Sequence, residues 1–166
     1  NDRYLKTYWS TYPDIWHHGD WAHKNEDGTW HIHGRSDDTI NVAGKRVGPP
    51  EIEGALLEND AVADAAAIAV PDDIKGVAVV CICVLKEGHS PSEGLTAALK
   101  AIVAERVGKP FSPREIGFAS ELPKTRSMKT MRRVIRATYL GEDTGDLSSL
   151  ANPEAIQAVK DATTTT

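Results

Sequence analysis

Alternating apolar and polar residues mark the first predicted elements of the chain. The two kinds alternate from Trp30 to Gly34, and Asp27-Gly28 is a strong signal for a tight turn. We therefore predict a β-hairpin over residues 20–34. Two shorter strands, over 39–42 and 46–47, are predicted around a second turn at Ala43-Gly44.

Helical periodicity and apolar runs interleave from residue 49 onward. Pro49-Pro50 opens a predicted helix that runs to about Asn59, because proline is tolerated in a first helical turn. The β-branched run from Val77 to Leu85 indicates a strand buried on both faces. The other predicted elements are a strand over 62–70, a helix over 91–107 with Ser90 as its N-cap, a strand over 114–119, a basic helix over 131–140 and a weak helix over 153–160. Helices and strands that interleave around a small sheet predict the α+β or the α/β class.

Composition narrows the class of protein. The chain has 166 residues and a formal net charge of −5, which suits one ordinary domain or one with part of another. No apolar run reaches the roughly 20 residues of a membrane span, and no secretory signal is recognisable. Two cysteines, Cys81 and Cys83, indicate a reducing, cytoplasmic location and are interpreted as core residues. The mild acidity argues against a nucleic-acid partner.

The aromatic residues are distributed unevenly along the chain. Seven of the ten lie within the first 30 residues, and five of the six histidines lie between His17 and His33. A single core is seldom built so unevenly, and the chain does not begin with Met. We therefore expect residues 1–36 to be the edge of a different, larger domain. We expect residues 143–166 to form a weakly ordered tail.

The clustered histidines raise the question of a metal site. His31 and His33 would share one face of a strand, but no cysteine lies near them. No carboxylate near them has a spacing usual for zinc either. We predict no metal site.

A second cluster of candidate functional residues is strongly basic. Six of the 19 basic residues lie within 13 positions, and no acidic residue occurs between Leu122 and Gly141. The six are Lys124, Arg126, Lys129, Arg132, Arg133 and Arg136. This pattern fits either a site for an anion or a solvated helix face. A flexible lysine in the loop ahead of the helix can be delivered to a phosphate or carboxylate as a point charge.

Two segments, in this order, resemble one enzyme family. Residues 8–53, YWSTYPDIWHHGDWAHKNEDGTWHIHGRSDDTINVAGKRVGPPEIE, are similar to the junction region of AMP-forming acyl-CoA synthetases. Residues 122–133, LPKTRSMKTMRR, are similar to the lysine motif near the C-terminus of that family. The spacing between the segments also fits. Within the adenylate-forming superfamily, the acetyl-CoA synthetase group is the nearest.

The resemblance implies a reaction and a domain arrangement. Such enzymes join a small carboxylic acid to ATP, supplied with Mg²⁺, and then transfer the acyl group from the adenylate to coenzyme A. A small C-terminal domain, with a central mixed sheet flanked by helices, moves between two poses, one for each step. Residues 37–142 would be this mobile domain, and residues 1–36 the C-terminal edge of the large N-terminal adenylation domain. The chain alone would be inactive, because the phosphate loop and the acyl pocket belong to the large domain. The competing interpretation is a non-catalytic module that docks an anion or a partner on residues 124–136.

The resemblance also assigns roles to three residues near the junction. Asp20 would hold the ribose hydroxyls of ATP, since a carboxylate accepts two hydroxyl donors well. Arg35 would contact the ribose or phosphate side of the nucleotide. Asp37 matches the hinge at which backbone rotation moves the small domain.

Three further roles fall within the small domain. Gly44 would let the backbone approach the pantetheine of coenzyme A, and Arg46 would reach the phosphates of ATP. Lys129 matches the catalytic lysine of adenylation, and by resemblance would also be a target for a lysine acetyltransferase and deacetylase. The chain departs from the family at two positions. Met128 stands where glycine is usual, and Ala104 stands where acetyl-CoA synthetases carry an arginine for a phosphate of coenzyme A.

Overall fold

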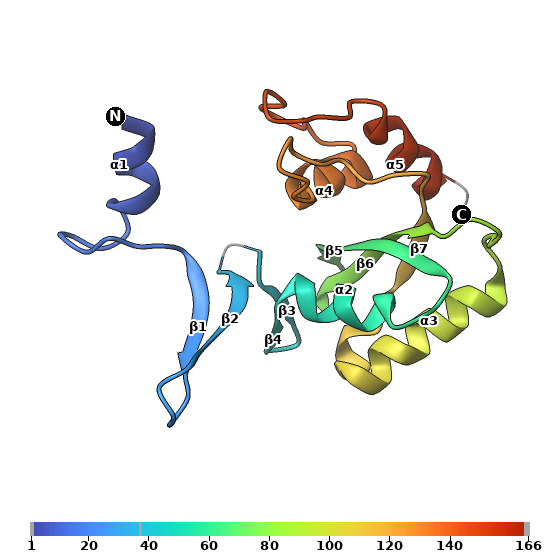
Figure 1. Ribbon diagram of the computed structural model, residues 1–166, viewed down its shortest axis with the longest axis horizontal. Coiled ribbons are helices and arrows are strands. Elements are labelled where there is room, and N and C mark those ends of the chain that lie inside the picture. Colours follow the sequence, from blue (N-terminus) through green and yellow to red (C-terminus); the bar gives the residue numbers. More distant parts are fainter. Residues whose placement is uncertain (1, 37, 165–166) are drawn as a thin grey trace. The chain divides into compact units, whose positions relative to one another are not determined.

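The computed structural model describes residues 2–36 and 38–164 and divides the chain into two compact units between Thr39 and Ile40 (Figure 1). Each unit is described by itself. Asp37, the predicted hinge, lies outside the described residues.

The first unit contains a helix, α1 (Asp2–Tyr8), and the predicted hairpin, made of β1 (Asp20–Lys24) and β2 (Trp30–Arg35). The two strands are antiparallel, with Asp20 paired to Arg35 at the open end. The side chain of Asp27 accepts a hydrogen bond from the backbone N–H of Thr29 at 2.9 Å, which closes the turn. The predicted hairpin is therefore confirmed, whereas α1 was not predicted.

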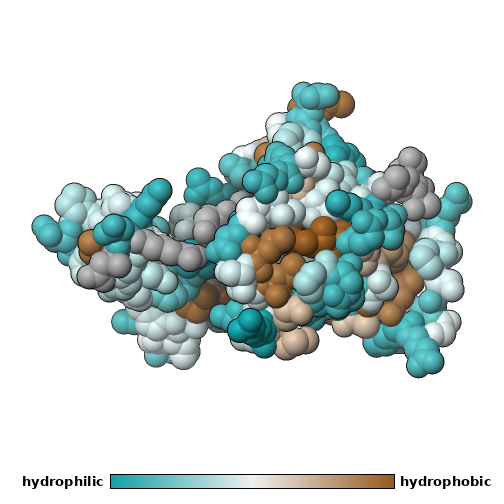
Figure 2. All heavy atoms as spheres, turned by 90° about the horizontal axis from the view of Figure 1, so that it is seen from above, coloured by the Kyte–Doolittle hydropathy of each residue, from teal (hydrophilic) through white to brown (hydrophobic). Residues whose placement is uncertain are grey.

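Large apolar side chains of the first unit are widely exposed. Trp16, Trp30 and Ile32 retain 49%, 64% and 63% of their accessible surface. Tyr4, Leu5, Trp9, Tyr12, Ile15 and Trp21 are also exposed. Such a concentration is unusual for a surface that faces only water, and it is typical of a surface that packs against other protein. On the face of the molecule in Figure 2, the broadest hydrophobic area lies on the second unit, and only small hydrophobic areas appear on the first.

The second unit is built on a three-stranded mixed sheet in the order β5-β6-β7. Its strands are β5 (Val62–Asp72), β6 (Gly76–Leu85) and β7 (Glu115–Phe118). The first two pair antiparallel, and β7 pairs parallel to β6. Four α-helices accompany the sheet: α2 (Pro49–Leu57), α3 (Glu93–Arg106), α4 (Arg132–Leu140) and α5 (Ala155–Thr164). A 3-10 turn, η1 (Lys109–Phe111), follows α3.

Two helices cover each face of this sheet (Figure 1). Side chains alternate along β6, so that Val79 and Cys81 pack with α2 and α3, whereas Val80 and Ile82 pack with α4 and α5. Both faces of β6 are therefore buried, as the continuous apolar run predicts. The expected α+β class, with a mixed sheet flanked by helices, is confirmed.

The two cysteines lie in the middle of β6 and are buried. Burial raises the pKa of the Cys83 thiol to about 12 and raises that of Cys81 well above its usual value. A neutral, enclosed thiol is unreactive, because the thiolate is the nucleophile and the metal ligand. Both cysteines are core residues, as expected.

Helix α3 begins two residues later than the sequence indicates. Its N-cap is Ser92 rather than Ser90, and the Ser92 hydroxyl accepts a hydrogen bond from the backbone N–H of Leu95 at 3.1 Å. Both serines precede the apolar residues at helical spacing, so the pattern does not distinguish them. Ser92 is the N-cap because it lies three residues before Leu95, whose backbone N–H has no acceptor within the helix.

Helix α5 lies within the segment expected to be a weakly ordered tail, and it overlaps the helix expected over 153–160. Ala155 and Val159 are fully buried, and α5 packs against α4 and β7. A Cβ on Gly117 of β7 would lie only 2.9 Å from the carbonyl oxygen of Ala162, so the glycine permits the close approach of helix and strand. The small apolar residues of this segment look weak as an isolated helix, but they cover a sheet face that would otherwise meet water.

None of the helices in the described part of the chain is long and apolar enough to cross a membrane.

Candidate functional site

Asp20 and Arg35 are brought together by the register of the first hairpin. They form the pair at the open end of β1 and β2, with 3.9 Å between Oδ1 of Asp20 and NH1 of Arg35. The other carboxylate oxygen of Asp20 lies 2.5 Å from Nδ1 of His18, and NH1 of Arg35 donates to the carbonyl oxygen of His18 at 3.0 Å. The Asp20 side chain keeps 20% of its surface exposed, so its oxygens remain reachable.

Gly19 is needed for this arrangement. Its φ of +85° lies in the left-handed region, and a Cβ would meet the guanidinium of Arg35 at 3.0 Å. Its carbonyl oxygen accepts from the backbone N–H and the hydroxyl of Ser36 at 2.8 and 3.0 Å. The glycine therefore lets the arginine lie across the start of β1.

Gly44 and Arg46 belong to a second hairpin, made of β3 (Ile40–Val42) and β4 (Lys45–Val47). Both turn residues have positive φ, +49° at Ala43 and +81° at Gly44, as a two-residue type I′ turn requires. No atom lies within 4 Å of the position of a Cβ on Gly44, so the outer side of the turn is open. Buried Ile40 and Val47 anchor the hairpin in the core.

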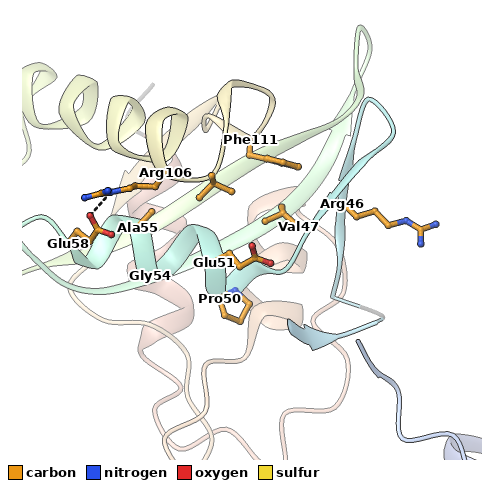
Figure 3. A pocket seen from close by; sticks show the side chains of 10 residues that line it. Arg46, Val47, Pro50, Glu51, Gly54, Ala55, Glu58, Arg106 and Phe111 are labelled. Atoms are coloured by element: carbon orange, nitrogen blue, oxygen red, sulfur yellow. Dashed lines mark hydrogen bonds and ion pairs between the residues drawn. The ribbon is translucent and has the colours of Figure 1, made fainter. Parts of the chain in front are cut away.

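The second hairpin borders a hollow of about 350 Å³ between α2, the end of α3 and η1 (Figure 3). Val47, Ala55 and Phe111 are among its lining, and Nε of Arg106 donates to Oε2 of Glu58 at 2.9 Å. Arg46 extends away from the other side chains that Figure 3 labels. Charged and apolar side chains therefore line the hollow together.

Lys129 lies on a third hairpin, which we call the lysine hairpin (residues 123–131). Its two arms are joined by backbone hydrogen bonds from Thr125 N–H to the Lys129 carbonyl at 2.9 Å and from Met131 N–H to the Pro123 carbonyl at 2.8 Å. The Thr125 hydroxyl also accepts from the Lys129 N–H at 3.1 Å. These contacts fix the backbone of Lys129 while its side chain stays exposed.

Met128, at the tip of this hairpin, has a φ of +61°. This left-handed conformation is one that glycine adopts without a steric penalty, whereas a residue with a Cβ pays about 1–2 kcal/mol. The Met128 side chain is 68% exposed. The departure from the glycine usual in the resembling family therefore falls on a position whose backbone favours glycine.

The basic cluster divides into anchored and unanchored side chains. The Lys124 ammonium lies 2.5 Å from Oδ2 of Asp64, and Arg132 donates to both carboxylate oxygens of Glu53 at 2.7 and 2.5 Å. Arg133 donates to the carbonyl oxygens of Thr144 and Asp146, and Arg136 to that of Ala69 and to Glu142.

The remaining two cations of the cluster are Arg126 and Lys129. Over residues 2–36 and 38–164, no hydrogen bond or ion pair engages either side chain. The six basic side chains therefore do not form a uniform docking face. Four of the six side chains are held by contacts within the domain, whereas Arg126 and Lys129 are held by none among the described residues.

Two structural residues escaped the sequence reasoning. Glu53 is only 8% exposed, and besides pairing with Arg132 it accepts from the Ala67 N–H at 2.9 Å. Asn152 lies in the tail, and its side chain contacts the base of the lysine hairpin. Nothing local to either residue signals these contacts, because their partners are distant in sequence.

Two of the clustered histidines stack on each other across the first hairpin. His23 and His31 face each other across the first hairpin with ring centroids 5.2 Å apart. Within the described ranges there is no group of three or more His, Cys, Asp or Glu that could hold a metal ion.

The fold and these hairpins define a small α+β domain that presents a lysine on a braced turn. A family model for the AMP-binding enzyme C-terminal domain matches residues 51–129, which run from α2 to Lys129 itself. Residues 51–129 are therefore assigned to this family.

Curated relatives align with nearly the whole chain. The chain is 42% identical over 161 residues to the acetyl-coenzyme A synthetase of Pyrobaculum aerophilum, and the alignment covers 97% of this chain and 24% of that protein. It is 42% identical over 162 residues to the 3-hydroxypropionyl-coenzyme A synthetase of Sulfurisphaera tokodaii, covering 98% of this chain and 24% of that one. The chain thus spans about a quarter of the length of these curated relatives.

A solved structure shares the fold. The acetoacetyl-CoA synthetase from Streptomyces lividans aligns with a TM-score of 0.85 at 22% identity, over 98% of this chain and 25% of that one. At this level of identity the likeness concerns the fold alone.

Proposed function

We propose that this chain is the C-terminal part of an AMP-forming acyl-CoA synthetase. The whole enzyme would join a small carboxylic acid to ATP, release pyrophosphate and transfer the acyl group from the adenylate to coenzyme A. The exposed aromatic surface of the first unit supports this proposal, because it would pack against the rest of a large nucleotide-binding domain.

The observation that carries the proposal is the ammonium of Lys129, which has no partner among the described residues and stands on a hairpin whose backbone is held by hydrogen bonds. Attack of a carboxylate on the α-phosphate brings two anions together and builds charge on the phosphoryl oxygens. A cation that touches both reactants offsets their repulsion and fixes their geometry. The neighbouring basic residues are held in structural contacts, so Lys129 is the one suited to this role, with Arg126 the nearest competitor.

The nucleotide roles follow from the two hairpins that flank the unit boundary. We propose that Asp20 binds the ribose hydroxyls and that Arg35, which lies beside it, contacts the nucleotide. Gly44 would admit the pantetheine of coenzyme A at its open turn, and Arg46 would reach the phosphates of ATP, which would arrive with Mg²⁺. Asp37 would be the hinge between the two half-reactions.

We propose acetate as the acid, on the strength of the curated relatives. Acetylation of Lys129 by a lysine acetyltransferase would erase the charge that adenylation needs, and would make this lysine a point of control in a cytoplasmic enzyme. The exposed ammonium, which has no partner among the described residues, supports this.

The proposal is tested on the full-length protein with acetate, propionate, acetoacetate and longer acids. We expect acid-dependent exchange of pyrophosphate into ATP, release of AMP, and the highest kcat/KM with acetate. Asp20→Ala should raise the KM for ATP and leave the KM for acetate within about twofold, since one hydrogen-bonding carboxylate is worth about 1.5–3 kcal/mol. Release of ADP in place of AMP, or exchange that does not depend on an acid, would contradict the proposal.

A further inference from the structure

The first arm of the lysine hairpin is held by a segment of the tail. The backbone N–H of Ala151 donates to the Lys124 carbonyl at 2.8 Å, and the Lys124 N–H donates to Oδ1 of Asn152 at 2.9 Å. Thr125 forms a further antiparallel bridge with Leu150. Residues 150–152 therefore run along the outer side of this arm, although they lie beyond the family match that ends at residue 129.

Asn152 uses both halves of its amide in this contact. Its oxygen accepts from Lys124 N–H, and its nitrogen donates to the Leu122 carbonyl at 3.0 Å and to Oε2 of Glu121 at 2.5 Å. A side chain that lacks either the acceptor or the donor loses part of this set. The Asn152 carbonyl also accepts from the N–H of Ala155 at 3.1 Å, and Ala155 is buried at the start of α5.

The same arm is fixed from the sheet. The Lys124 ammonium pairs with Asp64 of β5, whose other carboxylate oxygen accepts from the Ala65 N–H at 2.9 Å. Lys124 is thus held by its side chain on β5 and by its backbone on Asn152. Its bridge partner across the hairpin is Thr130, which directly follows Lys129.

We propose that Asn152 is a positioning residue for Lys129. It touches no reactant, and acts by fixing the Lys124 backbone, from which the bridge to Thr130 sets the place and direction of the Lys129 side chain. The inference rests on the adenylation role proposed for Lys129. It adds that the tail, through α5 and Asn152, is part of the machinery that delivers the lysine in the first half-reaction.

Measuring the two half-reactions separately distinguishes a misplaced lysine from a general loss of folding. Adenylation needs the lysine within contact of both reactants, and a misplacement of about 1 Å costs up to about a hundredfold in rate. Thioester formation from supplied acyl-adenylate does not use it. In the full-length protein, Asn152→Ala should therefore lower kcat of pyrophosphate exchange by about ten- to a hundredfold, with the KM values for ATP and acid and the thioester step unchanged within about twofold.

A matched variant, Asn59→Ala, controls for the loss of an asparagine. Asn59 also accepts one backbone N–H, that of Ala61 at 3.0 Å, but in the turn between α2 and β5. We expect it to leave exchange within about twofold of the parent. A second readout is amide hydrogen exchange, which should quicken at Lys124 and Thr125 in Asn152→Ala and stay unchanged there in Asn59→Ala. Asn152→Ser, a milder change, should alter both readouts in the same direction.

Each outcome bears on one claim. If Lys129→Ala abolishes exchange while Asn152→Ala and Asn152→Ser leave it intact, the positioning role is overturned and the proposed function stands. An equal loss in both half-reactions for the Asn152 variants also overturns it, because that is the mark of general destabilisation. If Lys129→Ala itself leaves exchange unchanged, the proposed function fails.

Discussion

Met128 places a costly backbone conformation beside the lysine that carries the proposed chemistry. Its φ of +61° suits glycine, and the side chain makes no use of burial, being 68% exposed. The hairpin tolerates it because four backbone and side-chain hydrogen bonds at residues 123–131 hold the turn closed. The cost therefore lies in the hairpin and not in the core.

Substitutions at Met128 should change the local stability of the lysine hairpin in opposite directions. Met128→Gly removes the steric penalty but gains freedom in the unfolded chain, for a net stabilisation between about zero and 1 kcal/mol. Met128→Val, which is β-branched, should destabilise the hairpin by about 1 kcal/mol or more. The Thr125 amide reports this through hydrogen exchange, which should quicken about fivefold in the Val variant. A Gly variant that exchanges faster than the Val variant would contradict the strain.

The Glu53–Arg132 ion pair is the most buried pair among those described and ties α2, β5 and α4 together. Glu53→Ala leaves the Arg132 guanidinium and the Ala67 N–H without an acceptor, so the free energy of unfolding should fall by about 3 kcal/mol. Glu58→Ala is the matched control at the end of the same helix. Its partner Arg106 keeps 58% of its side-chain surface, so the loss should stay below about 1 kcal/mol. Urea unfolding measures both, and equal losses would refute the difference.

At the scale of elements, strand β6 contributes buried side chains to both faces of the sheet. Because its cysteines are buried, the free energy of unfolding depends on pH. The Cys83 thiol ionises near 9 when unfolded and, because burial excludes the thiolate, its pKa rises to about 12 when folded. The unfolded chain therefore loses a proton that the folded chain keeps between these values. The contribution of the neutral thiol is fully present below pH 9 and is lost as the pH rises toward 12.

The free energy of unfolding should therefore decline with rising pH more steeply in the parent chain than in Cys83→Ala. Above the unfolded pKa the difference in slope approaches about 1.4 kcal/mol per pH unit. Urea unfolding under reducing conditions, at several pH values from 8 upward, gives both slopes. Tyrosine and lysine titrations cancel in the comparison, and parallel slopes would show that the thiolate is not excluded from the fold.

Most elements could be predicted from local pattern. The alternation around Asp27-Gly28 gives the first hairpin, and the β-branched run from Val77 gives β6, because each signal is contained in its own segment. The packing of helix α5 and the exact start of α3 could not. The first depends on a sheet face made by distant residues, and the second on which of two serines reaches a free N–H.

At the scale of the whole molecule, the candidate site is partly visible in the sequence. Motif resemblance names Asp20, Arg35, Gly44, Arg46 and Lys129, and the structure adds which cations are already committed. The contacts of Glu53 with Arg132 and of Asn152 with Glu121 were not predictable, since each joins residues more than 25 positions apart. Resemblance thus identifies the residues proposed to touch ligands, while only the fold identifies those that hold them.

One lysine, and not the charge of the whole basic segment, is proposed to carry adenylation. Arg126 is the sharpest comparison, because it lies on the same hairpin and its side chain has no partner within the described residues either. In the full-length protein, loss of the Lys129 ammonium removes an interaction made in the transition state of the first half-reaction only.

The most direct test measures both half-reactions in Lys129→Ala and Arg126→Ala. We predict that Lys129→Ala lowers acid-dependent pyrophosphate exchange by about 100- to 1,000-fold and leaves thioester formation from supplied acyl-adenylate within about twofold of the parent. Arg126→Ala should retain both activities within about tenfold. Undiminished exchange in Lys129→Ala, or an equal loss of exchange in the two variants, would contradict the account.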